Sequence, residues 1–149
     1  MSQVLLVRHG QASWGAADYD VLSELGEEQS RVLGRSLAAR GVRPATVVRG
    51  AMRRHRQTAE EAVAAAGWDV EVFEDHGWDE FDHEQMLALH PPGVEQGEEL
   101  TRAAFQQWFE EATLRWTAGA HAHEYDESFA DFGRRVDAAL RRTVERLDR

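Results

Sequence analysis

The sequence predicts an α/β fold of three layers, in which helices cover both faces of a mainly parallel central sheet. Apolar runs of strand length alternate with helical stretches through the first half of the chain, which predicts parallel strands joined by right-handed crossovers. The length of 149 residues and the hydrophobic fraction of 42% are typical of a single globular domain. We therefore expect one domain over residues 1–149.

The first strand is predicted over residues 3–8, where four consecutive apolar side chains suit a sheet that is covered on both faces. A loop rich in Gly, Ala and Asp follows over residues 10–20. Ser23 is a typical helix N-cap, and Gly41 is typical of a helix end. Between them, apolar residues recur at helical spacing, namely Leu25, Val32, Leu33 and Leu37.

Two further strands and a helix complete the first half. Strands are predicted over residues 45–48 and 70–73, and a helix over residues 51–66 that ends at Gly67. Each strand is separated from the next by a helix, as a parallel sheet requires. The first, second and third strands should therefore lie in one sheet.

The second half is predicted to be helical. A short helix over residues 83–89 ends before Pro91 and Pro92. A longer helix spans 98–117, with an apolar face of Leu100, Phe105, Trp108, Phe109 and Leu114. The last helix spans 128–147, with an apolar stripe of Phe129, Phe132, Val136, Leu140 and Val144. We expect residues 82–126 to form a helical lid within the domain.

Charge and composition exclude several classes of function. The net charge of −10 and pI of about 5.1 disfavour binding to nucleic acid or to an anionic membrane. The absence of cysteine excludes disulfides and thiolate chemistry. No apolar run is long enough for a membrane span or a signal peptide, so we expect a cytoplasmic protein. An anionic substrate would require arginines concentrated at one site.

The first candidate cluster follows the first predicted strand, where open α/β sheets bind ligands. His9 is a candidate nucleophile, because one ring nitrogen can be fixed by a hydrogen bond while the other attacks. Arg8 offers a guanidinium for a phosphate, and Gly10 allows close approach of the backbone to an anion. Gln11 and Ser13 are candidates for neutral hydrogen bonds to the same anion. An ordinary loop remains the alternative for this cluster alone.

The second candidate cluster spans residues 49–60, with four arginines in eight positions. It opens a predicted helix, whose unpaired N–H groups and dipole attract phosphate. A solvated basic face, paired with Glu60 and Glu61, is the alternative for Arg49, Arg53 and Arg56. An interior arginine close to the helix start is the better pocket candidate.

The third feature is Glu80, flanked by Trp78 and Phe81. Protonation of a leaving group requires a carboxyl group that is partly desolvated, so that its pKa rises. Aromatic neighbours favour this environment. Residues 71–84 contain seven acidic side chains, so an acidic surface segment is the alternative.

Together these motifs resemble the histidine phosphatase superfamily, also called the phosphoglycerate mutase-like family. Val-Arg-His-Gly resembles its signature on the first strand, and residues 52–59 resemble its second arginine motif. Further resemblance lies in residues 22–34, in Asp79-Glu80-Phe81 and in residues 132–136. The resemblance implies that His9 becomes transiently phosphorylated, that Arg8 and Arg54 neutralise the phosphoryl oxygens, and that Glu80 protonates the leaving group. It implies no metal and no cofactor.

Two positions depart from the family pattern. Members usually carry Asn after the Trp that follows Arg-His-Gly, whereas Gly15 follows Trp14 here. The family also has a second active-site His on a strand after the last helix, and no residue matches it. His121 and His123 precede that helix and do not take the role. Because a sheet without an interior strand exposes two edges, we expect the sequence to be a fragment rather than a degenerate protein.

The expected function is a phosphomonoesterase that acts on a small phosphorylated metabolite through a phosphohistidine. Phosphoglycerate mutase-type phosphotransfer and a catalytically weakened phosphate-binding homologue are the alternatives. A metal site at His121, His123, Glu124 and Asp126 lacks a complete ligand set. The substrate's leaving group and the oligomeric state are not encoded in any pattern of the sequence.

Overall fold

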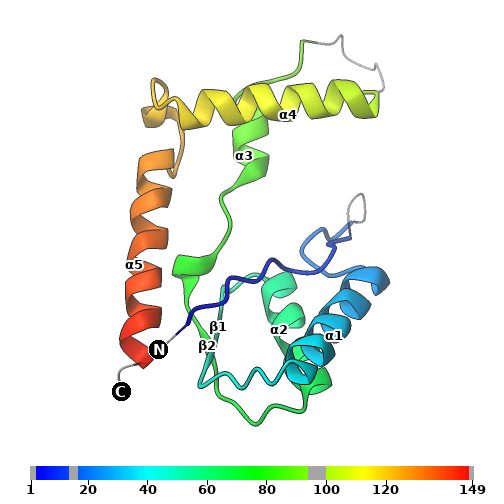
Figure 1. Ribbon diagram of the computed structural model, residues 1–149. Coiled ribbons are helices and arrows are strands. Elements are labelled where there is room, and N and C mark those ends of the chain that lie inside the picture. Colours follow the sequence, from blue (N-terminus) through cyan, green and yellow to red (C-terminus); the bar gives the residue numbers. More distant parts are fainter. Residues whose placement is uncertain (1–2, 14–16, 94–99, 148–149) are drawn as a thin grey trace. The chain divides into compact units, whose positions relative to one another are not determined.

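The computed structural model describes residues 3–13, 17–93 and 100–147 (Figure 1). It comprises two compact units, one formed by Met1–Asp79 with Ala138–Arg149 and the other by Glu80–Asp137. The elements, in chain order, are α1 (Glu24–Ala39), β1 (Val47–Arg49), α2 (Arg53–Ala66), β2 (Val72–Glu74), η1 (His76–Trp78), α3 (His83–Ala88), α4 (Arg102–Thr117), η2 (Ala122–Glu124) and α5 (Phe129–Leu147). The predicted start of the long helix at residue 98, and the Trp14–Gly15 departure, lie outside the described residues.

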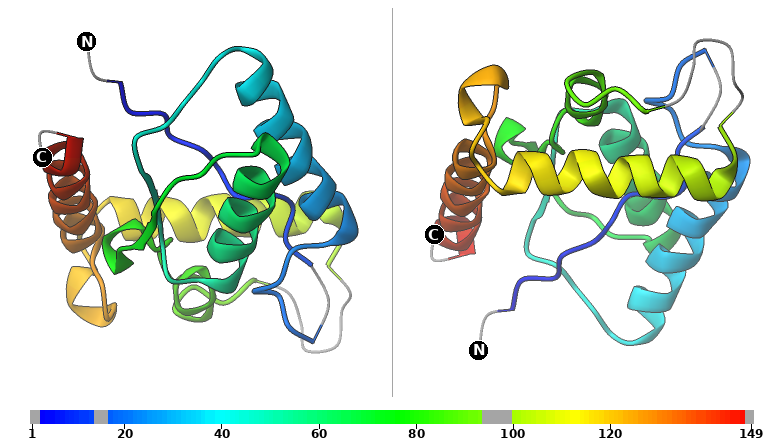
Figure 2. Two further views of the ribbon diagram at one scale, coloured as in Figure 1. Left: turned by 90° about the horizontal axis from the view of Figure 1, so that it is seen from below. Right: turned by 90° about the horizontal axis from the view of Figure 1, so that it is seen from above.

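The predicted α/β class with parallel strands is confirmed in the first unit. β1 and β2 pair in parallel, with Val48 opposite Phe73, and α2 provides the crossover between them. The strands lie between α1 and α2 on one side and the second half of α5 on the other (Figures 1 and 2). Among the described residues the sheet has two strands.

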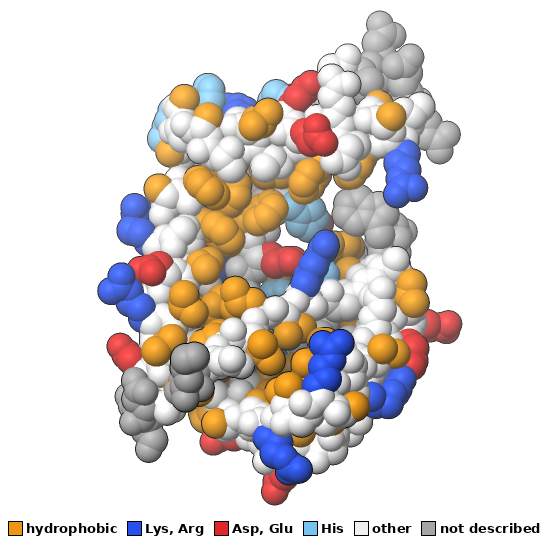
Figure 3. Space-filling view, in the orientation of Figure 1, with side chains coloured by type: hydrophobic (Ala, Val, Ile, Leu, Met, Phe, Trp, Pro, Cys, Tyr) orange, Lys and Arg blue, Asp and Glu red, His pale blue; other side chains and the backbone are white. Residues whose placement is uncertain are grey.

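The predicted first strand, residues 3–8, is wrong: the segment is extended chain without strand pairing. Its apolar side chains are exposed, from 38% for Val4 to 74% for Leu6. Apolar side chains gather on this face of the unit, where the segment lies (Figure 3). A strand requires a hydrogen-bonding neighbour. In the described part of the chain before α1, the one β-bridge joins Ala12 to Leu22, outside residues 3–8.

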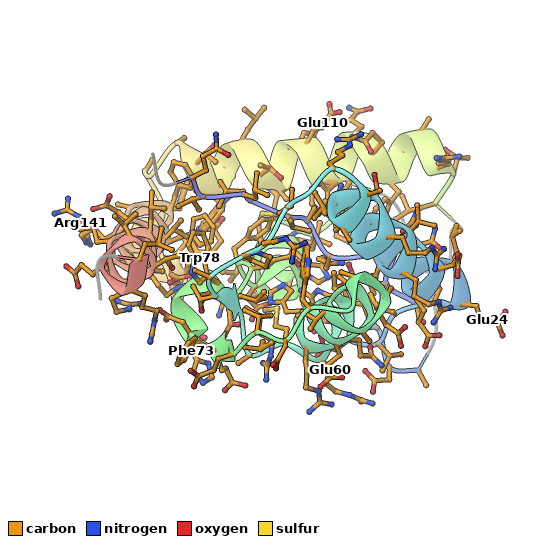
Figure 4. All side chains as sticks on the ribbon, turned by 60° about the horizontal axis from the view of Figure 1, so that its bottom comes forward. Glu24, Glu60, Phe73, Trp78, Glu110 and Arg141 are labelled. Atoms are coloured by element: carbon orange, nitrogen blue, oxygen red, sulfur yellow. The ribbon has the colours of Figure 1, made fainter. Side chains whose placement is uncertain are left out.

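Small residues, rather than leucines, form the buried face of α1. The buried residues of α1 are Gly26, Ser30 and Gly34, and a Cβ at Gly34 would lie 2.1 Å from the Ala62 carbonyl oxygen. The two backbones therefore touch at Gly34. Leu25 and Val32, part of the predicted apolar stripe, are about half exposed, while Glu24 and Glu60 point away from the helix pair (Figure 4).

The ends of α1 and α2 follow the predicted signals. The Ser23 hydroxyl accepts a hydrogen bond from the Gly26 N–H, and so caps α1 as expected. Gly67, with φ of 65°, ends α2 in the left-handed conformation that favours glycine.

The second half of α5 is held to the segment that follows β2. Arg142 donates two hydrogen bonds of 2.8 Å to the Asp75 carboxylate. The indole of Trp78, labelled in Figure 4, donates to Thr143 Oγ1 at 3.1 Å. Ala139 and Thr143 are the buried residues here, whereas Leu140 and Val144 of the predicted stripe are 37% and 42% exposed.

The second unit has its own core, formed where α3 and α4 meet the loop before α5. Its buried members are Met86, Ala112, Trp116 and Tyr125. Leu114, predicted on the apolar face of α4, is 67% exposed instead. Among the described residues, no helix combines the length and the apolar character that a membrane span requires.

Candidate active site

His9 lies in the loop between the N-terminal segment and α1, and it is half-buried. Its Nδ1 lies 2.6 Å from the carbonyl oxygen of Gly10. Because a carbonyl oxygen only accepts, we assign the ring proton to Nδ1. The lone pair then lies on Nε2. A nucleophilic imidazole requires this tautomer.

Gly10 fixes this loop against α1 and α2. A Cβ on Gly10 would lie 2.3 Å from the carbonyl oxygen of Gly26 in α1, and the Gly10 N–H donates to Thr58 Oγ1 in α2 at 3.0 Å. Close approach to an anion was the expected reason for this glycine. The structure gives a packing reason, since any side chain here would collide with the α1 backbone.

Gln11 and Ser13, the predicted neutral donors, continue the same loop. The Gln11 Oε1 accepts from the Ser23 hydroxyl at 2.8 Å, and the Gln11 N–H donates to Gln29 Oε1 at 2.9 Å. The Ser13 N–H donates to the carbonyl oxygen of Val21 at 2.8 Å. These bonds tie the loop to the start of α1.

Arg54 is the buried arginine of the second motif, with 4% of its surface exposed. Its guanidinium donates to Asp20 Oδ1 at 2.8 Å and lies over the Tyr19 ring, 5.3 Å from the centroid. The Thr58 hydroxyl donates to the Arg54 carbonyl oxygen and accepts from Gly10. The turn of α2 that carries Arg54 is therefore bonded directly to the His9 loop.

Asp20 also occupies the start of α2. It accepts hydrogen bonds from the backbone N–H groups of Arg53 and Arg54. Burial acts to raise the pKa of Asp20, but the hydrogen bonds from these N–H groups and from the Arg54 guanidinium outweigh it and lower the pKa. In this structure, therefore, the carboxylate of Asp20 accepts hydrogen bonds from two of the N–H groups at the start of α2.

The other arginines of the motif lie at the surface or in ion pairs. Each has an acidic partner: Arg49 with Glu74, Arg53 with Asp18 and Arg56 with Glu60. Arg8 is exposed and forms no ion pair within the described residues. The alternative of a solvated basic face thus describes Arg53 and Arg56, and the buried position belongs to Arg54.

Glu80 is the first residue of the second unit. It lines a cavity of about 150 Å³ whose other walls are acidic, aromatic or amide side chains: Asp82, Gln85, Trp116, Tyr125, Asp126 and Glu127. Trp116 and Tyr125 also belong to the core of that unit. Glu80 is therefore partly buried beside aromatic rings.

His55 and Asp79 are site residues to which the sequence pattern gave no role. The His55 ring lies 5.8 Å from the His9 ring, measured between centroids, and its Nδ1 lies 3.9 Å from Asp79 Oδ1. His55 stands next to Arg54 inside the arginine motif, and a titratable residue at that position was the available signal. Asp79 stands next to Glu80, and nothing in the sequence distinguishes it from the other acidic residues of 71–84.

The residues around His121, whose sequence offers no complete set of metal ligands, bind one another in the structure. His121 Nδ1 lies 2.8 Å from Glu124 Oε1, and Glu124 accepts from Arg115 at 2.5 Å. Within the described ranges, no group of three or more His, Cys, Asp or Glu side chains is arranged to hold a metal ion.

Comparison with known proteins identifies a family and individual similar proteins. The sequence model of the histidine phosphatase superfamily (branch 1) matches residues 4–149. A 2,3-bisphosphoglycerate-dependent phosphoglycerate mutase of Thermobifida fusca (strain YX) is 40% identical over 74 residues, which cover 45% of this chain and 30% of the mutase. The chain thus spans less than a third of that relative.

Two solved structures are also similar. SixA from Agrobacterium tumefaciens, described as a phosphohistidine phosphatase, is 24% identical with a TM-score of 0.45, over 56% of each chain. Mycobacterial hydrolase 1 is 20% identical with a TM-score of 0.40, over 89% of this chain and 77% of its own.

Proposed function

This chain belongs to the histidine phosphatase superfamily, and from that premise we propose that it is a phosphomonoesterase with His9 as its nucleophile. The proposed substrate is a small phosphorylated metabolite. The observation that carries the proposal is the Gly10 carbonyl oxygen 2.6 Å from His9 Nδ1. This contact directs the proton to Nδ1 and the nucleophilic lone pair to Nε2.

The proposed reaction has two steps. In the first, His9 Nε2 forms a bond to phosphorus as the bond from phosphorus to the leaving oxygen breaks, and the leaving alkoxide takes a proton from Glu80. In the second, water attacks phosphorus, the bond to Nε2 breaks, and Glu80 takes the proton from water. Phosphate leaves, and both residues return to their starting states.

Charge on the phosphoryl oxygens is neutralised in this proposal by Arg8 and Arg54. Burial favours Arg54 for this role, because a charge–charge interaction is stronger away from water. Asp20 holds the Arg54 guanidinium at 2.8 Å and so restricts its rotamer. Gln11 and Ser13 are proposed to add hydrogen bonds at the mouth of the site.

Steady-state hydrolysis of p-nitrophenyl phosphate tests the assignment of His9. The wild type is expected to release p-nitrophenol, and His9→Ala to lose at least about a thousandfold in kcat, as removal of a covalent nucleophile does. His121→Ala is the matched control, because it removes an exposed imidazole of the second unit. Equal rates in wild type and His9→Ala would remove His9 from the mechanism.

Phosphoglycerate mutase-type phosphotransfer is the second candidate, favoured by the identity of 40% to the Thermobifida fusca mutase. A mutase returns the phosphoryl group to the substrate, whereas a phosphatase passes it to water. Incubation with 3-phosphoglycerate separates the two. We expect free phosphate to exceed the 2-phosphoglycerate formed, and the reverse ratio would select the mutase.

We propose that residues 82–126 form the helical lid that the sequence predicts. These residues lie within the second unit. The cavity beside Glu80 gives this segment concave acidic and aromatic walls. A cytoplasmic location and a bacterial source remain predictions from composition.

A further inference from the structure

The loop of His9 brings a second imidazole into the site. The rings of His9 and His55 lie 5.8 Å apart, tilted by 41°. His55 belongs to the first turn of α2, and 11% of its side-chain surface is exposed. Both rings lie in the first unit, which also contains Arg54.

Asp79 lies on the Nδ1 side of His55, and two observations fix this arrangement. Asp79 Oδ1 lies 3.9 Å from His55 Nδ1 and accepts the Ala51 N–H at 2.6 Å. Its Oδ2 lies 3.1 Å from the ring of His76. The carboxylate is thus held beside the start of α2 from two directions.

Gly50 makes room for both side chains. A Cβ at Gly50 would lie 2.3 Å from His55 Nδ1 and 2.7 Å from Asp79 Oδ1. The imidazole and the carboxylate therefore converge on the one residue of this turn that lacks a side chain. Nδ1 is the His55 nitrogen that lies beside Asp79, which leaves Nε2 as the second ring nitrogen.

We propose that His55 is a second catalytic imidazole, which donates a hydrogen bond from Nε2 to a non-bridging oxygen of the phosphoryl group on its way to His9. This inference rests on the proposed function. In this proposal the donor is the protonated ring, which carries a proton on each nitrogen, and the Nε2 proton is the one that binds the anion. His55 forms no covalent bond to the substrate and keeps its proton throughout the reaction. Asp79 acts through His55 as a positioning residue.

A donor of this kind acts mainly on the transition state, where charge on the phosphoryl oxygens is redistributed. His55→Ala is therefore expected to lower the single-turnover rate of His9 phosphorylation by p-nitrophenyl phosphate about a hundredfold. KM should change much less than kcat. Arg56→Ala, which removes an exposed neighbour on the same helix, is the matched control and should stay within about twofold of wild type.

Binding of inorganic phosphate provides a readout that does not depend on turnover. Isothermal titration of wild type, His55→Ala and Arg56→Ala should show about tenfold weaker binding in His55→Ala alone, as expected for loss of one charged hydrogen bond. His55→Gln retains a side-chain N–H donor and should recover part of both losses. Circular dichroism identifies any variant that does not fold, and His55→Gln then replaces His55→Ala.

Asp79 is tested by a double-mutant cycle. Asp79→Asn should lower kcat in the wild-type background and have little further effect in the His55→Ala background, because Asp79 acts only through that ring. Equal losses in the two backgrounds would assign Asp79 a purely structural role and overturn its part in the inference.

Failure of this inference is distinguishable from failure of the proposed function. If wild type forms a phosphoenzyme, but His55→Ala matches it in rate and in phosphate affinity, the role of His55 is overturned and the function stands. If wild type forms no phosphoenzyme, the function fails. Phosphate affinity that then still depends on His55 supports the anion contact, and affinity independent of His55 overturns it too.

Discussion

The carboxylate of Asp20 contacts both the start of α2 and the side chain of Arg54. It caps the start of α2 through the N–H groups of Arg53 and Arg54, and it fixes the Arg54 guanidinium. An aspartate in a loop rich in Gly, Ala and Asp gives no sequence signal for this role. The contact exists because the fold brings Asp20 to a helix that begins 33 residues later.

Replacing this carboxylate should weaken the site without removing any group that reacts. Asp20→Asn is expected to lower kcat/KM for p-nitrophenyl phosphate about tenfold, equivalent to about 1.4 kcal/mol, because Arg54 loses its charged partner. Asp18→Asn is the control, since Asp18 pairs with the exposed Arg53. Equal activity of Asp20→Asn and wild type would show that Arg54 needs no such support.

At the scale of elements, helices were predicted well because their signals are local. A single residue, Ser23, predicts the start of α1, and a single residue, Gly67, predicts the end of α2. The packing faces were predicted less well. Leu25 and Val32 have helical spacing yet are exposed, because Gly26, Ser30 and Gly34 form the buried face of α1 and Gly34 contacts α2. Close backbone contact depends on the partner helix, which no local pattern describes.

Strand formation shows the same limit more sharply. Residues 3–8 have the apolar character of a buried strand, but β-structure is completed only by a neighbouring strand. β1 and β2 form because α2 returns the chain alongside. Among the candidate residues, the motif pointed to Arg54, which is buried, whereas the proximity of His55 to Asp79 is visible only in the fold.

Two glycines within helices give opposite predictions, because Gly34 lies where α1 contacts α2 and Gly133 lies in open space. Gly34→Ala should destabilise the protein by about 2–3 kcal/mol, because its Cβ would strike the Ala62 backbone. Gly133→Ala should stabilise it by about 0.5–1 kcal/mol, since a Cβ there meets nothing within 4 Å. Urea unfolding measures both. A Gly34→Ala variant as stable as wild type would contradict the close approach.

At the scale of the whole molecule, acid should unfold the protein through its paired carboxylates. Hydrogen bonds from Arg142 lower the pKa of Asp75, although burial acts to raise it. The pKa of Asp20 is lowered as well. A lowered pKa in the folded state contributes stability that is present above the unfolded value near pH 4 and is lost as pH falls through the folded value.

Thermal unfolding between pH 6 and pH 2 measures this dependence. The Tm of wild type should fall most steeply below about pH 4. Asp75→Asn should lower stability by about 1–2 kcal/mol at neutral pH and flatten the acid dependence, because its carboxylate no longer titrates. Asp69→Asn, at an exposed position in the loop before β2, is the control. A slope unchanged by Asp75→Asn would place the acid sensitivity elsewhere.

The central claim is that one imidazole, fixed by its own neighbouring carbonyl, accepts the phosphoryl group. The most direct measurement is to incubate the protein with p-nitrophenyl phosphate, quench in base and map the phosphorylated residue by mass spectrometry. The account predicts an acid-labile phosphohistidine at His9 in wild type and in His121→Ala, and none in His9→Ala. Phosphate on any other residue, or persisting in His9→Ala, would contradict it.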